Sequence, residues 1–171
     1  DTKTGAVRAV NGGRKQTTLL GYNRATDNTR STGSTIKPVI DYGPAIEYLN
    51  YSTGQTIMDQ RTTYSNGVEL NNWDFSHKGA MTLRTALVYS RNTTALQTFK
   101  AVGETNIKSF LNNLDIQIKN DGQDYLVESN SIGADISPIK MAAAYATFGN
   151  YGTYSKPYTV RKVTTRDGQV T

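Results

Sequence analysis

Pro38 is the residue that most constrains how this chain of 171 residues can fold. It lies near the start of the apolar-rich stretch IKPVIDYGPAIEYL (36–49), whose spacing predicts a buried helix. Proline is tolerated only in the first turn of a helix, because it has no N–H to donate and its ring collides with the preceding turn. The helix must therefore begin at about Ser34 or Thr35, and we expect an interruption near Gly43-Pro44.

This predicted helix start contains a Ser-x-x-Lys pair, Ser34 and Lys37. Residues three apart in a helix lie on one face, and a serine at the N-terminus lies at the positive end of the helix dipole. Gly33 would allow a close backbone approach. Such a serine is a candidate nucleophile if burial and neighbouring cations keep the amine of Lys37 neutral. Taken alone, the pair is equally explained by a capping serine and a surface lysine.

A second Ser-x-x-Lys match and a Ser-x-Asn tripeptide decide between these interpretations. The second match, Ser137 to Lys140, begins the predicted helix SPIKMAAAYATF with Pro138 at its first position, so we interpret it as structural. Ser90-Arg91-Asn92 falls between two predicted helices, where a short loop would direct a hydroxyl and an amide toward a cleft. Alone it is typical of a helix cap and loop. Together with Ser34 and Lys37, Ser90 and Asn92 indicate a catalytic group of four residues.

Strand patterns at both ends of the chain flank a helical block, which predicts an α+β domain with helices covering an antiparallel sheet. The helices are expected after Thr82, over 95–102 with a stop at Gly103, over 107–114, and over 137–148 with Met141, Tyr145 and Phe148 buried. The strands are expected at 5–13, 17–23 and 158–165, the last followed by a hairpin turn at Asp167-Gly168, and residues 50–81 as a long irregular segment.

Composition excludes several kinds of site. There is no cysteine, so disulfides, thiolate catalysis and cysteine metal sites are ruled out. The one histidine, His77, has no catalytic companion in the sequence and is expected on the solvated surface, which argues against a Ser-His-Asp triad. The net charge is +5, but the basic residues are scattered and form no known nucleic-acid module, so nucleic acid is not an expected partner. Within this stretch we expect neither a membrane-spanning segment nor a signal peptide, because no apolar run is long enough, and a longer parent protein could carry an anchor.

Four stretches resemble the transpeptidase domain of class A penicillin-binding proteins, the bifunctional peptidoglycan synthases. They cover essentially the whole chain in the order usual for that family. The stretches are GGRKQTTLLGYNRATDNTRSTGSTIKPV (12–39), NWD (72–74), TLRTALVYSRNTTA (82–95) and SPIKMAAAYATFGNYGTYSKP (137–157). The resemblance implies a penicillin-binding/β-lactamase-like fold of the α+β class, and no metal or organic cofactor.

The resemblance also implies an activity, D,D-transpeptidation of peptidoglycan stem peptides, and a role for each candidate residue. Ser34 would be the nucleophile acylated by substrate or by β-lactams, and Lys37 the base. Ser90 would relay a proton, and Asn92 would orient Lys37 and the donor peptide. The implied partners are stem peptides and β-lactam antibiotics. The implied location is the outer face of the bacterial cytoplasmic membrane, reached only through an anchor in a preceding part of the parent protein.

Lys3-Thr4-Gly5 matches the third motif of this family, Lys-Thr/Ser-Gly, but stands first in the chain instead of last. By the resemblance it belongs to a turn into the first strand and is a decoy. The functional copy is expected beyond the hairpin at Asp167-Gly168, so residues 1–171 are expected to be the N-terminal portion of a domain whose missing C-terminal part is itself a partner. Three other functions stay open from the residues: a D,D-carboxypeptidase or β-lactamase-type hydrolase, a non-catalytic β-lactam sensor or peptidoglycan-binding module, and a nucleic-acid binder.

Overall fold

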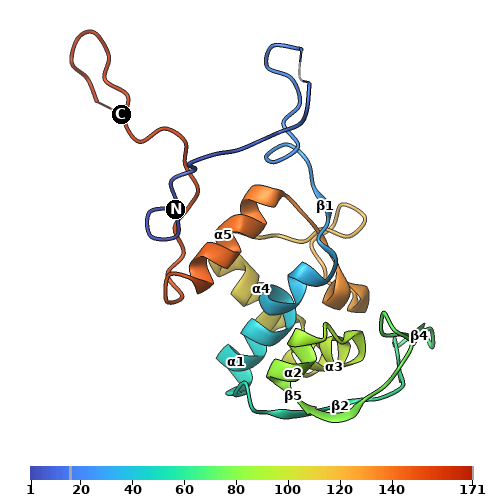
Figure 1. The fold of residues 1–171 in the computed structure, drawn as a ribbon. Coiled ribbons are helices and arrows are strands. Elements are labelled where there is room, and N and C mark those ends of the chain that lie inside the picture. Colours follow the sequence, from blue (N-terminus) through green and yellow to red (C-terminus); the bar gives the residue numbers. More distant parts are fainter. Residues whose placement is uncertain (16, 171) are drawn as a thin grey trace. The chain divides into compact units, whose positions relative to one another are not determined.

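The computed structural model of the protein describes residues 1–15 and 17–170. They form two compact units, one of Arg30–Ile136 and one of Asp1–Thr29 together with Ser137–Thr171. The described residues form helices and three short two-stranded antiparallel pairs (Figure 1), which confirms the predicted α+β class. In the described part of the chain, no helix has the length and apolar character needed to cross a membrane.

The Arg30–Ile136 unit begins with a helical run whose hydrogen-bonding pattern changes twice. The run consists of the 3₁₀ turn η1 (Gly33–Ile36), the π-helix η2 (Pro38–Tyr42) and α1 (Gly43–Leu49). It starts where Pro38 required. The expected interruption near Gly43-Pro44 was wrong, because the N–H of Gly43 donates to the carbonyl of Pro38 and the chain passes directly into α1. A Cβ on residue 43 would lie 2.6 Å from that carbonyl oxygen and 2.9 Å from the Phe110 ring, so this close turn needs glycine.

Residues 50–81, expected to be irregular, contain two antiparallel strand pairs instead. The pairs are β2 (Thr56–Asp59) with β5 (Gly79–Thr82), and β3 (Thr62–Thr63) with β4 (Glu69–Leu70). These strands are short and polar, so no alternating pattern announces them, and β2 and β5 are stabilised by partners about twenty residues away in sequence. The β2–β5 pair contacts α2, and the side chains of Ile57 and Met81 pack on a small core of Tyr42, Leu83 and Ala86.

The helices of this unit lie close to the predicted positions. Thr82 caps the first of them, its hydroxyl accepting the N–H of Thr85 at 3.1 Å, and Gly103 at φ +79° separates the next two. The remaining elements of the unit are α2 (Leu83–Val88), α3 (Asn92–Val102), α4 (Glu104–Asn113), the 3₁₀ turn η3 (Glu128–Ile132), and β6 (Asp135–Ile136) paired with β1 (Arg30–Ser31). α3 is the central element: it packs against η2, α1, α4 and η3 and buries most of its residues. Figure 1 shows α3 together with α1 and α4 in this unit.

The other unit contains α5 (Pro138–Phe148), which begins at the predicted proline. Its buried face is not the predicted one. Tyr145 and Phe148 are 44% and 42% exposed and contact each other edge to face, whereas the small residues Ala143 and Ala144 are buried. The small residues of this helix are therefore the ones that face inward, and its two large aromatic residues are left partly exposed.

The strands expected at 5–13, 17–23 and 158–165 do not form in the described residues. The segments are extended or turn-like, and what pairing they have is limited to isolated bridges of Ala6 with Tyr158 and of Thr164 with Val170. Alternation of apolar and polar residues makes a strand possible, but a strand needs a partner along its length. The turn at Asp167-Gly168 is present, with Gly168 at φ +84°.

Candidate active site

The amine of Lys37 is the centre of the candidate site. It donates to three oxygens from one loop: the Ser90 carbonyl at 2.8 Å, the Ser90 hydroxyl at 3.1 Å and the Asn92 side-chain oxygen at 2.7 Å. The side chain of Lys37 has no exposed surface. More than fifty residues separate these groups in sequence, and the fold brings them together because η2 packs on α3, the helix that Asn92 begins. Three of the four predicted site residues therefore meet.

Ser34, the fourth, lies on η1 directly before this amine. Its carbonyl accepts the backbone N–H of Lys37, and its side chain is exposed. The hydroxyl of Ser34 takes no part in the hydrogen bonds of the Lys37 amine to the described residues. Gly33 has a φ of +52°, a left-handed conformation that glycine adopts without strain, and the chain enters η1 there. The arrangement thus presents an exposed hydroxyl one short turn from a buried amine.

Burial determines the charge of this amine. Desolvation lowers the pKa of Lys37 to about 8, since an ammonium is poorly solvated there. The carboxyl of Asp41 acts in the opposite direction and raises the pKa, while the nearby guanidinium of Arg91 lowers it further. A lysine amine with a pKa this close to neutrality is partly unprotonated under physiological conditions and can accept a proton.

The loop that carries Ser90 and Asn92 is held from both sides. The N–H of Ser90 donates to the Leu87 carbonyl at 2.9 Å, at the end of α2. The N–H of Asn92 donates to the side chain of Asn72 at 2.7 Å, and the Asn92 side-chain amide donates to the Asn71 carbonyl at 2.9 Å. Because that amide nitrogen is engaged, the amide oxygen of Asn92 faces Lys37.

Arg91, between them, is the buried support of the loop. Its guanidinium donates to Asp59 at 2.8 Å, to both carboxylate oxygens of Asp74 at 2.9 and 3.0 Å, and to the Ser76 carbonyl. The Arg91 and Asp59 side chains are both fully buried. A buried ion pair is stable only when its remaining donors and acceptors are also satisfied, and here they are.

The second anchor of this network is Asp59 on β2. Its carboxylate also accepts from Asn72 at 2.8 Å, from Thr93 at 2.6 Å and from the N–H of Lys78 at 2.9 Å. Burial opposes the charge of Asp59, but the hydrogen bonds from Thr93 and Asn72 outweigh it and hold the pKa of the carboxyl below its ordinary value. The network fixes β2, the 72–76 turn and the start of α3 to one another.

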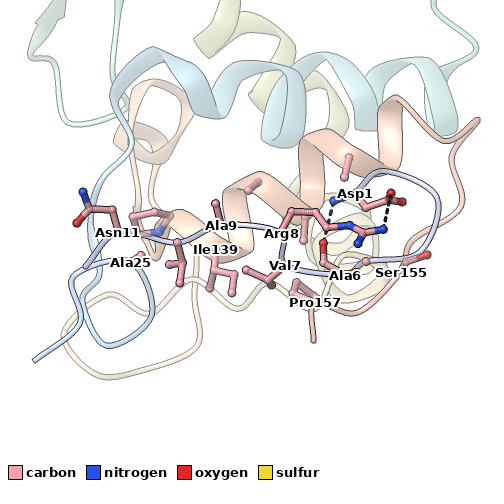
Figure 2. A pocket seen from close by; sticks show the side chains of 16 residues that line it. Asp1, Ala6, Val7, Arg8, Ala9, Asn11, Ala25, Ile139, Ser155 and Pro157 are labelled. Carbon is pink, nitrogen blue, oxygen red and sulfur yellow. Dashed lines mark hydrogen bonds and ion pairs between the residues drawn. The ribbon is translucent and has the colours of Figure 1, made fainter. Parts of the chain in front are cut away.

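A pocket in the other unit has no such chemistry. It has a volume of about 410 Å³ and is lined mainly by apolar groups, among them Val7, Ile139 and Pro157 (Figure 2). Its charged residues, Asp1 and Arg8, approach each other at 3.7 Å. None of the residues predicted to be catalytic lines it.

The remaining sequence candidates occupy ordinary positions. Ser137 precedes α5 at the predicted cap position, although its side chain accepts no capping hydrogen bond from the described backbone. His77 is exposed, as expected. Lys3-Thr4-Gly5 forms a turn in which the Asp1 carboxylate accepts the N–H groups of Lys3 and Thr4, which confirms the predicted turn.

Comparison with known proteins decides the family. The family model described as the penicillin-binding protein transpeptidase domain matches residues 1–171. The chain belongs to this family. Penicillin-binding protein 1A/1B of Bacillus subtilis (strain 168) is 43% identical over 98% of this chain, and penicillin-binding protein 1A of Streptococcus pneumoniae R6 is 40% identical over 98%. These alignments span 18% and 24% of the two relatives' lengths. The resemblance to class A penicillin-binding proteins is thereby confirmed.

Solved structures show the same fold. The crystal structure of penicillin-binding protein 1A from Haemophilus influenzae matches with a TM-score of 0.73 and 28% identity, covering 88% of this chain and 22% of that one. The PonA1 protein from Mycobacterium tuberculosis in complex with penicillin V matches with a TM-score of 0.78 and 24% identity, covering 88% of this chain and 43% of that one. The penicillin-binding fold expected from the sequence is confirmed.

Sequence reasoning missed the charged residues that support the site of this transpeptidase-family chain. Arg91 is only the variable middle residue of a Ser-x-Asn tripeptide, and Asp59 lies in a segment expected to be irregular. Asp41 offered a signal that could have been used, namely a carboxyl inside an otherwise apolar stretch.

Proposed function

We propose that this chain carries the nucleophile and base of a serine D,D-transpeptidase that cross-links peptidoglycan stem peptides. The single observation that supports this most is the Lys37 amine, fully buried, bound by Ser90 and Asn92 and preceded by the exposed Ser34. Family membership supports the same reaction class. Because the curated relatives are much longer than this chain, the activity of the whole protein is part of the proposal.

In the proposed acylation step, the Ser34 hydroxyl attacks the carbonyl carbon between the two terminal D-alanines of a donor peptide. The O–H proton passes to the neutral amine of Lys37, and a bond forms from Ser34 oxygen to the carbonyl carbon. Collapse of the tetrahedral intermediate breaks the C–N bond, and a proton relayed through the Ser90 hydroxyl, which contacts Lys37, leaves with the D-alanine amine. Asn92 orients Lys37 and the donor peptide.

In the second step an amine of a neighbouring stem peptide attacks the acyl ester, and Ser34 is released. A β-lactam resembles the donor terminus. When Ser34 attacks its carbonyl carbon the ring C–N bond breaks, but the nitrogen stays attached to the acyl group through the rest of the molecule, so it does not leave the site and the acyl-enzyme persists. The PonA1 complex with penicillin V gives a precedent for ligand class in a protein of the same fold. Water in place of the amine would give a carboxypeptidase or β-lactamase from the same residues.

We further propose that residues beyond this stretch supply a Lys-Thr/Ser-Gly motif that completes the site, and that the parent protein holds the domain at the outer face of the cytoplasmic membrane. On this proposal, the 171-residue chain alone reacts weakly or not at all with penicillin, and the full-length protein reacts fully.

The test is labelling with a fluorescent penicillin, followed by peptide mapping of the adduct. Wild-type full-length protein should be labelled on Ser34, and Ser34→Ala should lose the label while remaining folded by circular dichroism. Ser137→Ala is the matched control, because it removes the serine of the second Ser-x-x-Lys match and should keep the label. An adduct that survives in Ser34→Ala, or that maps to Ser137, would overturn the assignment. Product analysis with donor and acceptor peptides then separates cross-linking from hydrolysis.

A further inference from the structure

Asp41 is a buried carboxyl that the proposed chemistry does not use. It lies four residues after Lys37, within the π-helical turn η2, and has no exposed surface. Neither of its carboxylate oxygens has a hydrogen-bond partner among the described residues. An ionised carboxylate without partners is costly to bury, so this position needs a compensating interaction. π-helical turns are rare and often occur at functional sites, and this one begins next to the candidate base.

The surroundings of Lys37 show what that interaction is. The three acceptors of its amine, on Ser90 and Asn92, are neutral oxygens, and Arg91 contributes a repelling positive charge. Among the described residues, Asp41 is the acidic group whose charge favours the ammonium form of Lys37. The effect is mutual. Burial raises the pKa of Asp41 well above its ordinary value and the positive charge of Lys37 acts in the opposite direction, so the Asp41 carboxyl is ionised chiefly when the Lys37 amine is protonated.

The other ionisable groups around this turn are already engaged or lie in solvent. Tyr42 shares a hydrogen bond with Thr94 at 3.1 Å, and burial raises the pKa of its phenol. Arg91 binds Asp59 and Asp74. Apart from Lys37, which directly precedes η2, the elements packed against η2 carry five charged groups. Glu47 on α1 is exposed. The other four form two ion pairs, Glu104 with Lys108 on α4, and Lys100 of α3 with Glu128 of η3.

We propose that Asp41 is a positioning residue for Lys37: its buried carboxyl, four residues further along the same helical run and without a hydrogen-bond partner among the described residues, favours the protonated form of the amine and so sets the pH above which Lys37 acts as a base. The inference rests on the proposed acylation of Ser34. When the Ser34 O–H bond breaks and the proton joins the amine, the new ammonium lies under the influence of the Asp41 charge, which stabilises it. Arg91 and burial act the opposite way, and the balance keeps the amine able both to accept the proton and to release it.

The experiment measures the rate constant for labelling of the full-length protein by a fluorescent penicillin as a function of pH. Wild type is compared with Asp41→Asn, which keeps the side-chain shape and removes the charge, and with Glu47→Gln. Glu47→Gln is the control, because it also replaces a carboxylate by an amide, but at an exposed position on the following helix. In wild type the rate rises as Lys37 loses its proton. Loss of Asp41 lowers the pKa of Lys37, so the rising limb in Asp41→Asn should move to lower pH by roughly 1 unit, with no movement in Glu47→Gln.

Each other outcome is informative. An unchanged midpoint in folded Asp41→Asn, even with a lower maximum rate, would overturn the inference, since a purely structural role changes amplitude and not the midpoint. An equal shift in Glu47→Gln would also overturn it, as a general charge effect. If Asp41→Asn does not fold, Asp41→Leu replaces it with the same expectation, and failure of both to fold would assign the carboxyl to stability alone. Absence of any label in wild type would instead reject the proposed function, and this inference with it.

Discussion

Ser90 adopts a backbone conformation that residues with side chains rarely adopt. Its φ is +51°, in the left-handed region, where a Cβ crowds the following carbonyl oxygen. Glycine would take the same conformation without this cost. The serine is held there while its hydroxyl and carbonyl both accept from Lys37, which indicates that local stability is given up for a hydrogen bond at the site.

Two substitutions at Ser90 separate the conformational role from the chemical one. Ser90→Gly should unfold at higher urea than Ser90→Ala, with a difference of about 1 kcal/mol, because glycine relieves the left-handed strain and alanine does not. Both variants should react with fluorescent penicillin roughly a hundredfold more slowly than wild type, because both lack the hydroxyl. A glycine variant no more stable than the alanine variant would show that the backbone is not strained, and an unchanged reaction rate in either would remove the hydroxyl from the mechanism.

At the residue scale, the sequence motifs predicted the groups that bind the Lys37 amine but missed Arg91 and the carboxylates that support their loop. Ser34, Lys37, Ser90 and Asn92 follow from two short patterns, since the chemistry restricts which residue types can stand there. Arg91 acts through the carboxylates of Asp59 and Asp74, which are 32 and 17 residues away in sequence. A tripeptide pattern cannot predict partners that come close only when the chain folds.

At the scale of elements, the Arg91 network is what connects strand β2 to the start of α3. Breaking a buried ion pair leaves the other charge buried and unpaired, which costs far more than losing an exposed pair. The pKa of Asp59 is held below its ordinary value, and hydrogen bonds from Arg91 and Ser76 hold the pKa of Asp74 well below its own. Both carboxyls therefore contribute stability above the unfolded pKa, near 3.9 for aspartate, and lose it as the pH falls toward their folded values.

Arg91→Met should destabilise the protein by roughly 3–5 kcal/mol, because it leaves the Asp59 carboxylate buried without its cation. Arg61→Met is the control: Arg61 also makes a two-bond contact to a carboxylate, that of Glu69, but its side chain is 78% exposed, and its loss should change stability little. Urea denaturation at neutral pH measures both. The difference between wild type and Arg91→Met should shrink toward acid pH, as Asp59 and Asp74 become protonated. A similar effect of the two substitutions would refute the structural role assigned to the buried pair.

The sequence predicted helices of this domain better than strands, for a physical reason. α3 and α4 each carry an apolar repeat that reports their own buried face, and Gly103 marks the stop between them. The strands β2 to β5 are two to four residues long and polar, and depend on partners elsewhere in the chain. On α5 the helix was correctly located but its buried face was wrong, because packing through alanines leaves the larger side chains outside.

For the molecule as a whole, the apolar core is distributed unevenly between the two units. Among the described residues, every buried apolar side chain except Ala143 and Ala144 lies within Arg30–Ile136. The candidate catalytic residues and their supporting ion pairs lie in that same unit. Apolar burial is the main favourable term in folding, so stability should be concentrated around the site rather than shared equally along the chain.

Hydrogen–deuterium exchange of the 171-residue chain, followed by mass spectrometry under native conditions, tests this distribution. Amides of α3 around Leu96 and Phe99 should exchange at least roughly a hundredfold more slowly than amides of the polar segment 17–29, because opening α3 exposes the core and opening that segment exposes almost none. Amides of α5 should fall between them, since that helix buries only small residues. Slow exchange in 17–29 equal to that of α3 would show that the chain unfolds as one cooperative body, and that the core around the site is not its most stable part.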